Sequence, residues 1–258
     1  MPDYEQIRLD VSGAIATITF DRPEKLNAWT TLMEREVADA VRFASGERAV
    51  RAIILTGSGR GFCAGADLNA APSTADGRPA PLGGPDRFEF LWDTPKILVA
   101  AINGPAAGVG LSISLYCDFR YMAQNASLTT AFARRGLIAE HGSAWLLPRL
   151  IGLQNANDLL LTGRKVEATE AAAMGLVRLC PAEDFLAGVQ QTVSKLFDQC
   201  SPRSIAVMKR QLKAALHETF AETRATTYQE QLLSLESADL REGVAAFLER
   251  RPAIFPGE

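Results

Sequence analysis

Two glycine-rich segments carry the residues of this chain that could do chemistry. They are residues 57–68, GSGRGFCAGADL, and residues 103–112, NGPAAGVGLS. Each follows an apolar run, 52–56 or 97–102, that predicts a buried strand. Glycine has no Cβ, so the backbone can approach another group closely. Two such turns side by side could direct two backbone N–H groups at one oxygen, an oxyanion hole for carbonyl or thioester chemistry. The alternative interpretation is that both segments are only tight turns.

The spacing around the glycines excludes three other motifs. A dinucleotide fingerprint starting at Gly57 would need a glycine where the chain has Phe62. A phosphate-binding P-loop would need Gly-Lys-Ser/Thr, which follows neither segment. A serine-hydrolase elbow would need a glycine two residues after Ser112, where Ser114 stands.

The composition indicates an ordinary globular protein. The chain has 258 residues, 47% hydrophobic and 22% charged, enough for one large core with a helical appendage. A net charge of −3 with scattered basic residues argues against nucleic-acid binding. No apolar run reaches the ~18 residues of a membrane span, and the first residues do not resemble a signal peptide. We therefore expect a cytoplasmic protein without membrane contact.

Cysteine and histidine usage gives no sign of a disulfide framework or a metal site. The four cysteines show no CxxC spacing, and there are only two histidines. We expect free thiols in a reducing compartment and no bound metal.

The pattern along the chain predicts an α/β fold with a helical C-terminal region. We place the division near residue 200, which gives a core of residues 1–200 and a helical region of residues 201–258. Residues 69–86 are rich in Ala, Pro and Gly and predict a long surface loop. The expected strands are 7–9, 14–20, 52–56, 97–102, 118–122 and 177–179. The expected helices are 30–43, 87–93, one ending near 116, 143–150, 155–161, 169–174, 183–199, 203–217, 219–235 and 238–249.

The chain resembles the crotonase, or enoyl-CoA hydratase/isomerase, superfamily nearly end to end. The matching segments are 21–28 (DRPEKLNA), 62–68, 103–110, 161–163 (LTG), 171–177 (AAAMGLV) and 241–252 (REGVAAFLERRP). The resemblance implies a spiral of ββα units with a C-terminal helical trimerisation region. It also implies a homotrimer or a dimer of trimers that acts on an acyl-CoA. Coenzyme A would then be part of the substrate, with no permanently bound cofactor.

The resemblance also implies roles for particular residues. The oxyanion donors would be the backbone N–H groups of Ala66 and Val109. Phe247 and Arg250 would reach the CoA from a neighbouring subunit. For Lys25 and Arg250, the alternative is an ordinary solvated charge. The implied CoA-binding residues are Lys25, Leu26, Ala28, Ala64, Ala66, Asp67, Leu68, Phe247 and Arg250.

The main departure from the family pattern is at the positions of the catalytic acids. Hydratases of the family use two glutamates, and this chain has Ser112 and Phe132 at those places. Glu140 lies in a segment that resembles one in family isomerases, where an acid faces the acyl pocket. A carboxyl group in apolar surroundings suits general acid–base work. The alternative is that Glu140 caps the helix beginning near Ser143 or pairs with an arginine.

A single acid favours double-bond isomerisation of an enoyl-CoA. One carboxylate can remove a proton and return it to another carbon. Hydration must activate a water and also deliver a proton to Cα, and two groups usually share these tasks. Two alternatives stay open: a hydratase that uses Glu140 with a water near Ser112, and a non-catalytic acyl-CoA-binding protein on the same scaffold. We interpret His141 as structural. Candidates for the acyl pocket, which could equally be core, are Ser112, Phe132, His141, Trp92 and Trp145.

Overall fold

The structure is a computed structural model that describes residues 2–70 and 84–258. Most of the loop expected at 69–86, namely residues 71–83, lies outside the described residues. Among the described residues, no helix is long and apolar enough to cross a membrane.

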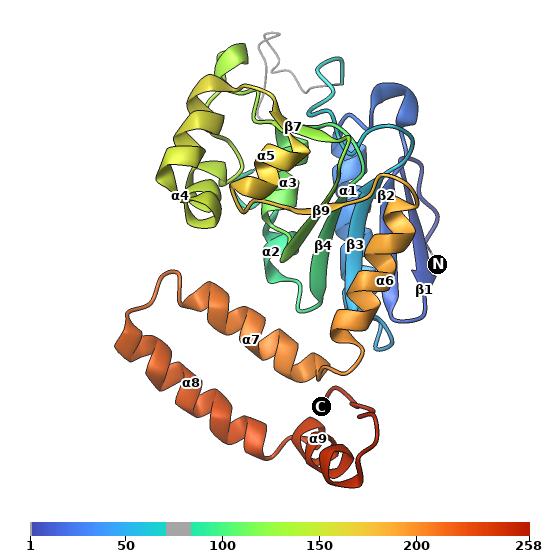
Figure 1. The fold of residues 1–258 in the computed structure, drawn as a ribbon, viewed down its shortest axis with the longest axis vertical. Coiled ribbons are helices and arrows are strands. Elements are labelled where there is room, and N and C mark those ends of the chain that lie inside the picture. Colours follow the sequence, from blue (N-terminus) through green and yellow to red (C-terminus); the bar gives the residue numbers. More distant parts are fainter. Residues whose placement is uncertain (1, 71–83) are drawn as a thin grey trace.

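A six-stranded sheet forms the centre of the α/β part (Figure 1). β1 and β2 form an antiparallel hairpin, and every later pairing in the sheet is parallel. All residues of β2, β3 and β4 are buried. These strands are covered on both faces, which explains their continuous apolar runs. In order across the sheet the strands are β1 (Ile7–Ser12), β2 (Ile15–Phe20), β3 (Ala52–Gly57), β4 (Ile97–Ile102), β6 (Phe119–Ala123) and β9 (Arg178–Cys180).

A second, three-stranded sheet was not expected from the sequence. It consists of β5 (Ala106–Ala107), β7 (Ser127–Thr129) and β8 (Val166–Glu167), in that order. Strands of two or three residues are too short to show a period of two, so no pattern could reveal them. β5 belongs to the second glycine segment, and this sheet therefore helps to fix its position.

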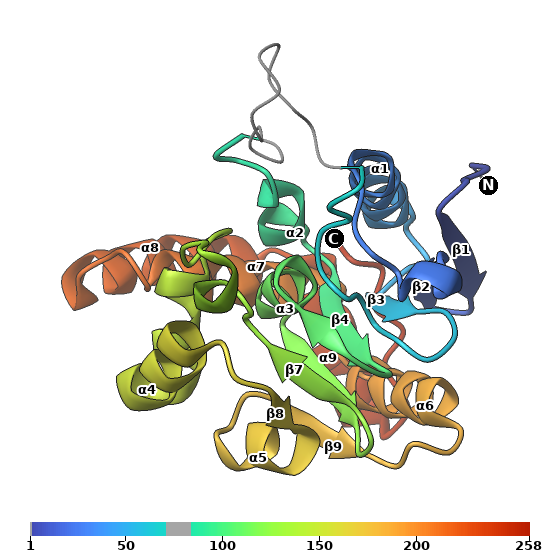
Figure 2. The same cartoon turned by 90° about the horizontal axis from the view of Figure 1, so that it is seen from above.

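Helices cover both faces of the main sheet. In Figure 2, α1 (Thr31–Gly46) lies on one face and α6 (Phe185–Phe197) on the other. The Thr30 side chain accepts a hydrogen bond from Met33 N, as expected for an N-cap. The remaining helices of this part are α2 (Glu89–Asp93), α3 (Val109–Leu115), α4 (Ser143–Thr162) and α5 (Ala168–Ala173), with 3-10 turns at Pro23–Lys25 and Ala133–Arg135.

The fourth helix confirms the expected break between two shorter helices. Gly152 has φ 75° and ψ 160°, which is not helical, so α4 consists of two pieces joined by a kink. Glycine adopts this positive φ without the steric cost that other residues would meet.

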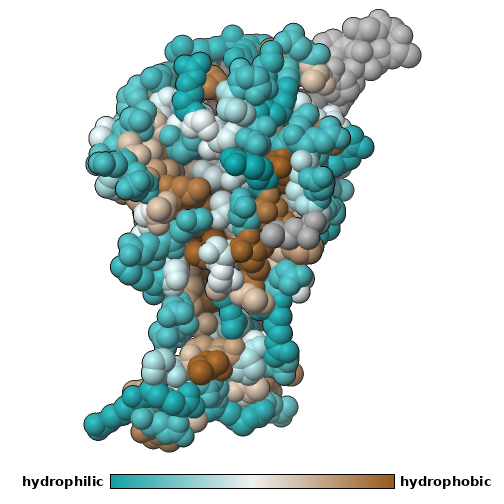
Figure 3. All heavy atoms as spheres, turned by 90° about the vertical axis from the view of Figure 1, so that its right-hand side faces the viewer, coloured by the Kyte–Doolittle hydropathy of each residue, from teal (hydrophilic) through white to brown (hydrophobic). Residues whose placement is uncertain are grey.

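Three helices follow the α/β part and extend away from it, and we call them the C-terminal arm. They are α7 (Pro202–Ala214), α8 (Phe220–Leu235) and α9 (Ala238–Glu249). Figure 3 shows the arm as a separate lobe, with hydrophobic side chains at the surface where it leaves the α/β part. The arm begins where the sequence placed the division, although its independence as a domain stays a prediction.

Candidate active site

The two glycine segments pack against each other. A Cβ added to Gly110 would lie 2.3 Å from the carbonyl oxygen of Cys63. One added to Gly104 would lie 2.2 Å from the carbonyl oxygen of Arg60. Cys63 also pairs with Ala106 in a parallel bridge. The side-by-side arrangement expected from the sequence is therefore present. It is possible because Gly104 and Gly110 have no Cβ.

The backbone ladder leaves the N–H of Ala66 outside its pairing with Trp29. Trp29 N donates to Gly65 O at 2.8 Å, and Asp67 N donates to Trp29 O at 2.9 Å. In this parallel bridge Gly65 and Asp67, the neighbours of Ala66, supply the C=O and N–H groups that bond to Trp29. The N–H of Ala66 itself therefore points to the opposite side of its strand.

The N–H of Val109 is free of the helix that it begins. Val109 is the first residue of α3, and Gly108 before it has φ 49°. The first helical bond runs from Ser112 N to Gly108 O at 2.9 Å. The N–H groups before Ser112 have no partner within the helix. Each glycine segment thus contributes one available backbone donor.

The two segments expected to bind CoA lie side by side. Ala64 N donates to Leu26 O at 3.0 Å. The Arg22 guanidinium joins both segments, because it donates to Ala28 O at 2.5 Å and forms a 2.9 Å ion pair with Asp67. The hydrogen bond from Arg22 lowers the pKa of Asp67, so this carboxylate is charged at neutral pH. Lys25 and Leu68 are both exposed beside this junction.

Phe247 and Arg250 are not brought to this site within one chain. Both are exposed, and Phe247 retains 82% of its accessible surface. Phe247 belongs to α9 and Arg250 directly follows it, in the arm at the far end of the molecule from the α/β part (Figure 1).

Glu140 lies in the turn that leads into α4. Its side chain is 37% exposed, and its Oε2 is 3.6 Å from His141 Nε2. The capping alternative is wrong, because α4 begins after Gly142 with no side-chain cap bond. It is the Glu140 main-chain carbonyl that accepts from Ser143, from N at 3.1 Å and from Oγ at 2.6 Å. Among residues 2–70 and 84–258, the basic side chain nearest to its carboxylate is His141, and no arginine forms an ion pair with it.

His141 is a partly buried, neutral side chain. Its Nε2 lies 3.3 Å from Arg87 NH1, and the Tyr116 hydroxyl donates to its carbonyl at 3.1 Å. Burial, and then the charge of Arg87, lower the pKa of His141 to about 4. The imidazole therefore carries no charge at neutral pH.

Ser112 ends the second glycine segment and Phe132 lies beside it, and neither supplies an acid. Ser112 is buried, and its Oγ donates to Gly108 O at 3.2 Å. Phe132 is also buried, and its ring lies 3.9 Å from the position that a Cβ on Gly108 would take.

An aromatic cavity of about 270 Å³ adjoins the turn that carries Glu140. The rings of Trp92 and Trp145 meet edge to face, with centroids 5.9 Å apart. The Tyr116 ring meets Trp92 at 6.3 Å. Trp92 and Trp145 therefore line a pocket rather than being fully enclosed core. The cavity is lined by Trp92, Tyr116, Gly142, Trp145, Leu146 and His217.

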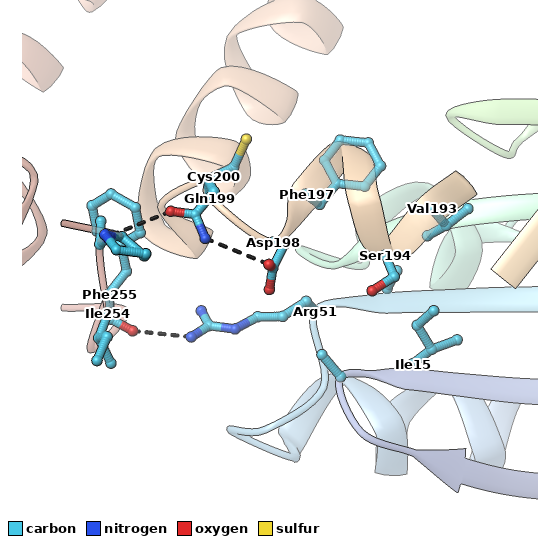
Figure 4. A pocket seen from close by; sticks show the side chains of 14 residues that line it. Ile15, Arg51, Val193, Ser194, Phe197, Asp198, Gln199, Cys200, Ile254 and Phe255 are labelled. Carbon is cyan, nitrogen blue, oxygen red and sulfur yellow. Dashed lines mark hydrogen bonds between the residues drawn. The ribbon is translucent and has the colours of Figure 1, made fainter. Parts of the chain in front are cut away.

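A second cavity, of about 340 Å³, lies where the C-terminal tail returns to the α/β part (Figure 4). Arg51 donates to Phe255 O at 2.9 Å, and Gln199 accepts from Ala253 N at 3.2 Å. These bonds attach the tail to the start of β3 and the end of α6. The lining of this cavity includes none of the residues expected to act on the substrate.

Sequence reasoning missed Arg87 and Glu34. Arg87 is buried between Glu34 on α1 and His141 before α4. No regular spacing relates these positions, so only the tertiary structure reveals their contact.

Comparisons with known proteins agree with these observations. A family model described as enoyl-CoA hydratase/isomerase matches residues 10–258. A probable enoyl-CoA hydratase of Rhodobacter capsulatus is 38% identical over 98% of this chain and 99% of its own length. A 1,2-epoxyphenylacetyl-CoA isomerase of Escherichia coli is 33% identical over the same shares. The crystal structure of an enoyl-CoA hydratase of Mycobacterium marinum covers 98% of this chain and 99% of its own, with TM-score 0.90 and 28% identity.

Proposed function

Because the chain belongs to the enoyl-CoA hydratase/isomerase family of enzymes, with the crotonase fold, we propose that it isomerises an enoyl-CoA. The observation that carries this proposal is the presence of one candidate acid, Glu140, where the family's hydratases have two. Ser112 and Phe132 replace both usual glutamates. Ser112 directs its hydroxyl to its own helix, which gives little support to the alternative of a water held there.

We propose that the N–H groups of Ala66 and Val109 hold the thioester oxygen. Their availability and the contact between the two glycine segments support this assignment. As the enolate forms, negative charge develops on that oxygen, and two fixed donors stabilise it. The loss of one such donor typically costs about 3–4 kcal/mol of transition-state stabilisation.

In the proposed reaction, Glu140 carries the proton between two carbons. The carboxylate removes a proton from Cα, and the C–H electron pair enters the conjugated enolate. The resulting carboxylic acid then returns the proton to Cγ on the same face, and the double bond moves next to the thioester. No water is consumed, so no second acid is needed.

The test compares wild type with Glu140→Gln on trans-3-enoyl-CoA and trans-2-enoyl-CoA substrates. Glutamine keeps the size of the side chain but cannot accept the proton. We expect isomerisation to fall about 10²- to 10⁴-fold, the usual contribution of general acid–base catalysis. Unchanged turnover in the variant would remove Glu140 from the mechanism. Efficient hydration by wild type would favour the hydratase alternative.

A ring-bearing acyl group is a second candidate for the substrate. The aromatic cavity beside Gly142 supports it, and one relative is named as an isomerase of a phenylacetyl-CoA epoxide. Aromatic rings pack edge to face at distances such as those of Trp92 and Trp145. Including an aryl-substituted 3-enoyl-CoA in the same assay tests this candidate. A lower KM than for an unbranched chain of equal carbon number is expected.

The residues at 25–28 and 64–68 are proposed to bind the CoA, with Phe247 and Arg250 added from a neighbouring subunit. The junction formed by Arg22 supports the first part. The exposure of Phe247 supports the second. A homotrimer or a dimer of trimers would supply that neighbour.

A further inference from the structure

A continuous set of side-chain contacts leads from the strand of Ala66 toward Glu140. Trp29, which pairs with Ala66, donates from its indole Nε1 to Glu34 Oε2 at 3.0 Å. Arg87 Nε donates to the same oxygen at 2.6 Å. The Arg87 NH2 also lies 2.5 Å from it, as an ionic contact without hydrogen-bond geometry. With only 3% of its side chain exposed, Arg87 is held by Glu34 inside the protein.

The other end of Arg87 contacts the turn that carries Glu140. Arg87 NH1 lies 3.3 Å from His141 Nε2, and that nitrogen lies 3.6 Å from Glu140 Oε2. The Phe88 ring packs edge to face on the imidazole at 5.3 Å and limits its rotation. These contacts join α1, the residues before α2 and the turn before α4, which are far apart in the sequence.

The direction of the hydrogen bond defines the state of the imidazole. A guanidinium can only donate, so Nε2 of His141 accepts and the ring proton is on Nδ1. Burial, and then the positive charge of Arg87, oppose protonation of His141 and lower its pKa to about 4. A protonated imidazole at this position would form an ion pair with Glu140 and make it a weaker base. Burial and Arg87 together thus keep positive charge off the imidazole that faces Glu140.

We propose that Arg87 is a positioning residue, which fixes the His141 imidazole and, with it, the turn that places the neighbouring Glu140 relative to the Ala66 strand. The inference rests on the proposed role of Glu140 and adds Glu34, Arg87 and His141 to it. The same contacts would set the distance between the donor of the oxyanion site and the acid. Small displacements there are costly, since about 1 Å can change a rate about 10²-fold.

The first test uses Arg87→Lys and Glu34→Gln. Lysine can keep the ion pair with Glu34 but lacks the second arm that reaches His141. Each variant should lower kcat about 10- to 100-fold with little change in KM, because neither residue lies in the proposed CoA-binding segments. The matched control is Glu36→Gln, two residues along the same helix. Glu36 is buried and accepts from Glu5 N and Gln6 N, so its loss tests structural damage alone.

The second test asks whether Arg87 acts through Glu140. In a Glu140→Gln background, adding Arg87→Lys should cause no further loss, because the group that it positions is gone. An independent additive loss in the double variant would overturn the proposal and indicate a structural role. A full rate in Arg87→Lys alone, with Glu140→Gln impaired, would reject the positioning role but keep the proposed function. Unimpaired Glu140→Gln would reject both.

The third test measures the imidazole directly. The chain has two histidines, so NMR of histidine-labelled protein can follow His141 in Arg87→Met, which removes the charge but keeps an apolar stem. The pKa of His141 should rise above about 4 but stay below its ordinary value of 6.5, because burial, the larger cause of the lowered pKa, remains. An unchanged value would mean that Arg87 does not control the charge beside Glu140.

Discussion

At the scale of single residues, Gly110 decides whether the two halves of the proposed oxyanion site can meet. It lies within α3, where glycine has a lower helix propensity than alanine. The close approach to Cys63 explains its presence, because any Cβ would collide with the Cys63 carbonyl. The need for contact between segments therefore overrides the local helix preference.

Gly110→Ala is expected to destabilise the protein by about 1–3 kcal/mol, because overpacking forces the backbone apart. It should also reduce turnover, since the same displacement moves the N–H of Val109. Urea unfolding and a steady-state assay would measure both effects. Gly188→Ala in α6 is the matched control, because a Cβ there meets nothing within 4 Å. That change should be neutral or stabilise by about 0.5–1 kcal/mol. Equal stability of the two variants would contradict the role given to Gly110.

At the scale of elements, α7 is attached to the α/β part by a buried ion pair. Lys209 Nζ donates to Asp118 Oδ2 at 2.6 Å and to Lys96 O at 2.7 Å. The Lys209 side chain is only 7% exposed. Asp118 also accepts from Leu98 N in β4, so one carboxylate joins the first helix of the arm to the central sheet.

Asp118→Asn is expected to cost about 3–5 kcal/mol, because it leaves the buried Lys209 charge without its counter-charge. Thermal and denaturant unfolding would show the loss. The double variant Asp118→Asn, Lys209→Met should recover part of it, since no buried charge then remains. Lys165→Met, in the exposed pair with Glu167, is the control and should change stability by less than about 1 kcal/mol. If Asp118→Asn lost no more stability than this control, the ion pair would not fix α7.

At the scale of the whole molecule, the C-terminal arm leaves large hydrophobic side chains exposed. None of the residues of α8 is buried against any other described part of the chain. Contiguous exposed apolar surface commonly marks an interface. The most exposed of these side chains are Leu212 at 74%, Phe220 at 82%, Phe247 at 82% and Leu248 at 74%.

This exposure favours self-association, and the trimer or dimer of trimers proposed above would have three or six times the mass of the 27.9 kDa chain. Light scattering after size-exclusion chromatography would measure this mass. Leu212→Asp should shift the distribution toward smaller species by placing a charge in the interface, whereas Lys165→Met, outside the arm, should not. A monomeric wild type at micromolar concentration would exclude the proposed contribution of Phe247 and Arg250 from a neighbour.

The sequence by itself determined the order of the long elements and the close approach of the two glycine segments. The apolar runs of β2, β3 and β4 and the amphipathic helices carry periodicity that can be read locally, and the break within α4 was expected as well. The glycine segments indicated a close backbone approach because no other residue type permits it. The family resemblance also predicted, without a structure, that Ser112 and Phe132 stand where the hydratases have their two acids.

Only the tertiary structure decided which distant residues meet. The short strands β5, β7 and β8 are defined by their partners rather than by their own residues. The contacts among Glu34, Arg87 and His141 depend on how α1 and the turn before α4 pack, and such packing leaves no spacing in the sequence. Periodicity is a local property of one helix or strand, so the sequence shows it directly. The position of a buried charge depends on every element that packs around it, so only the tertiary structure shows it.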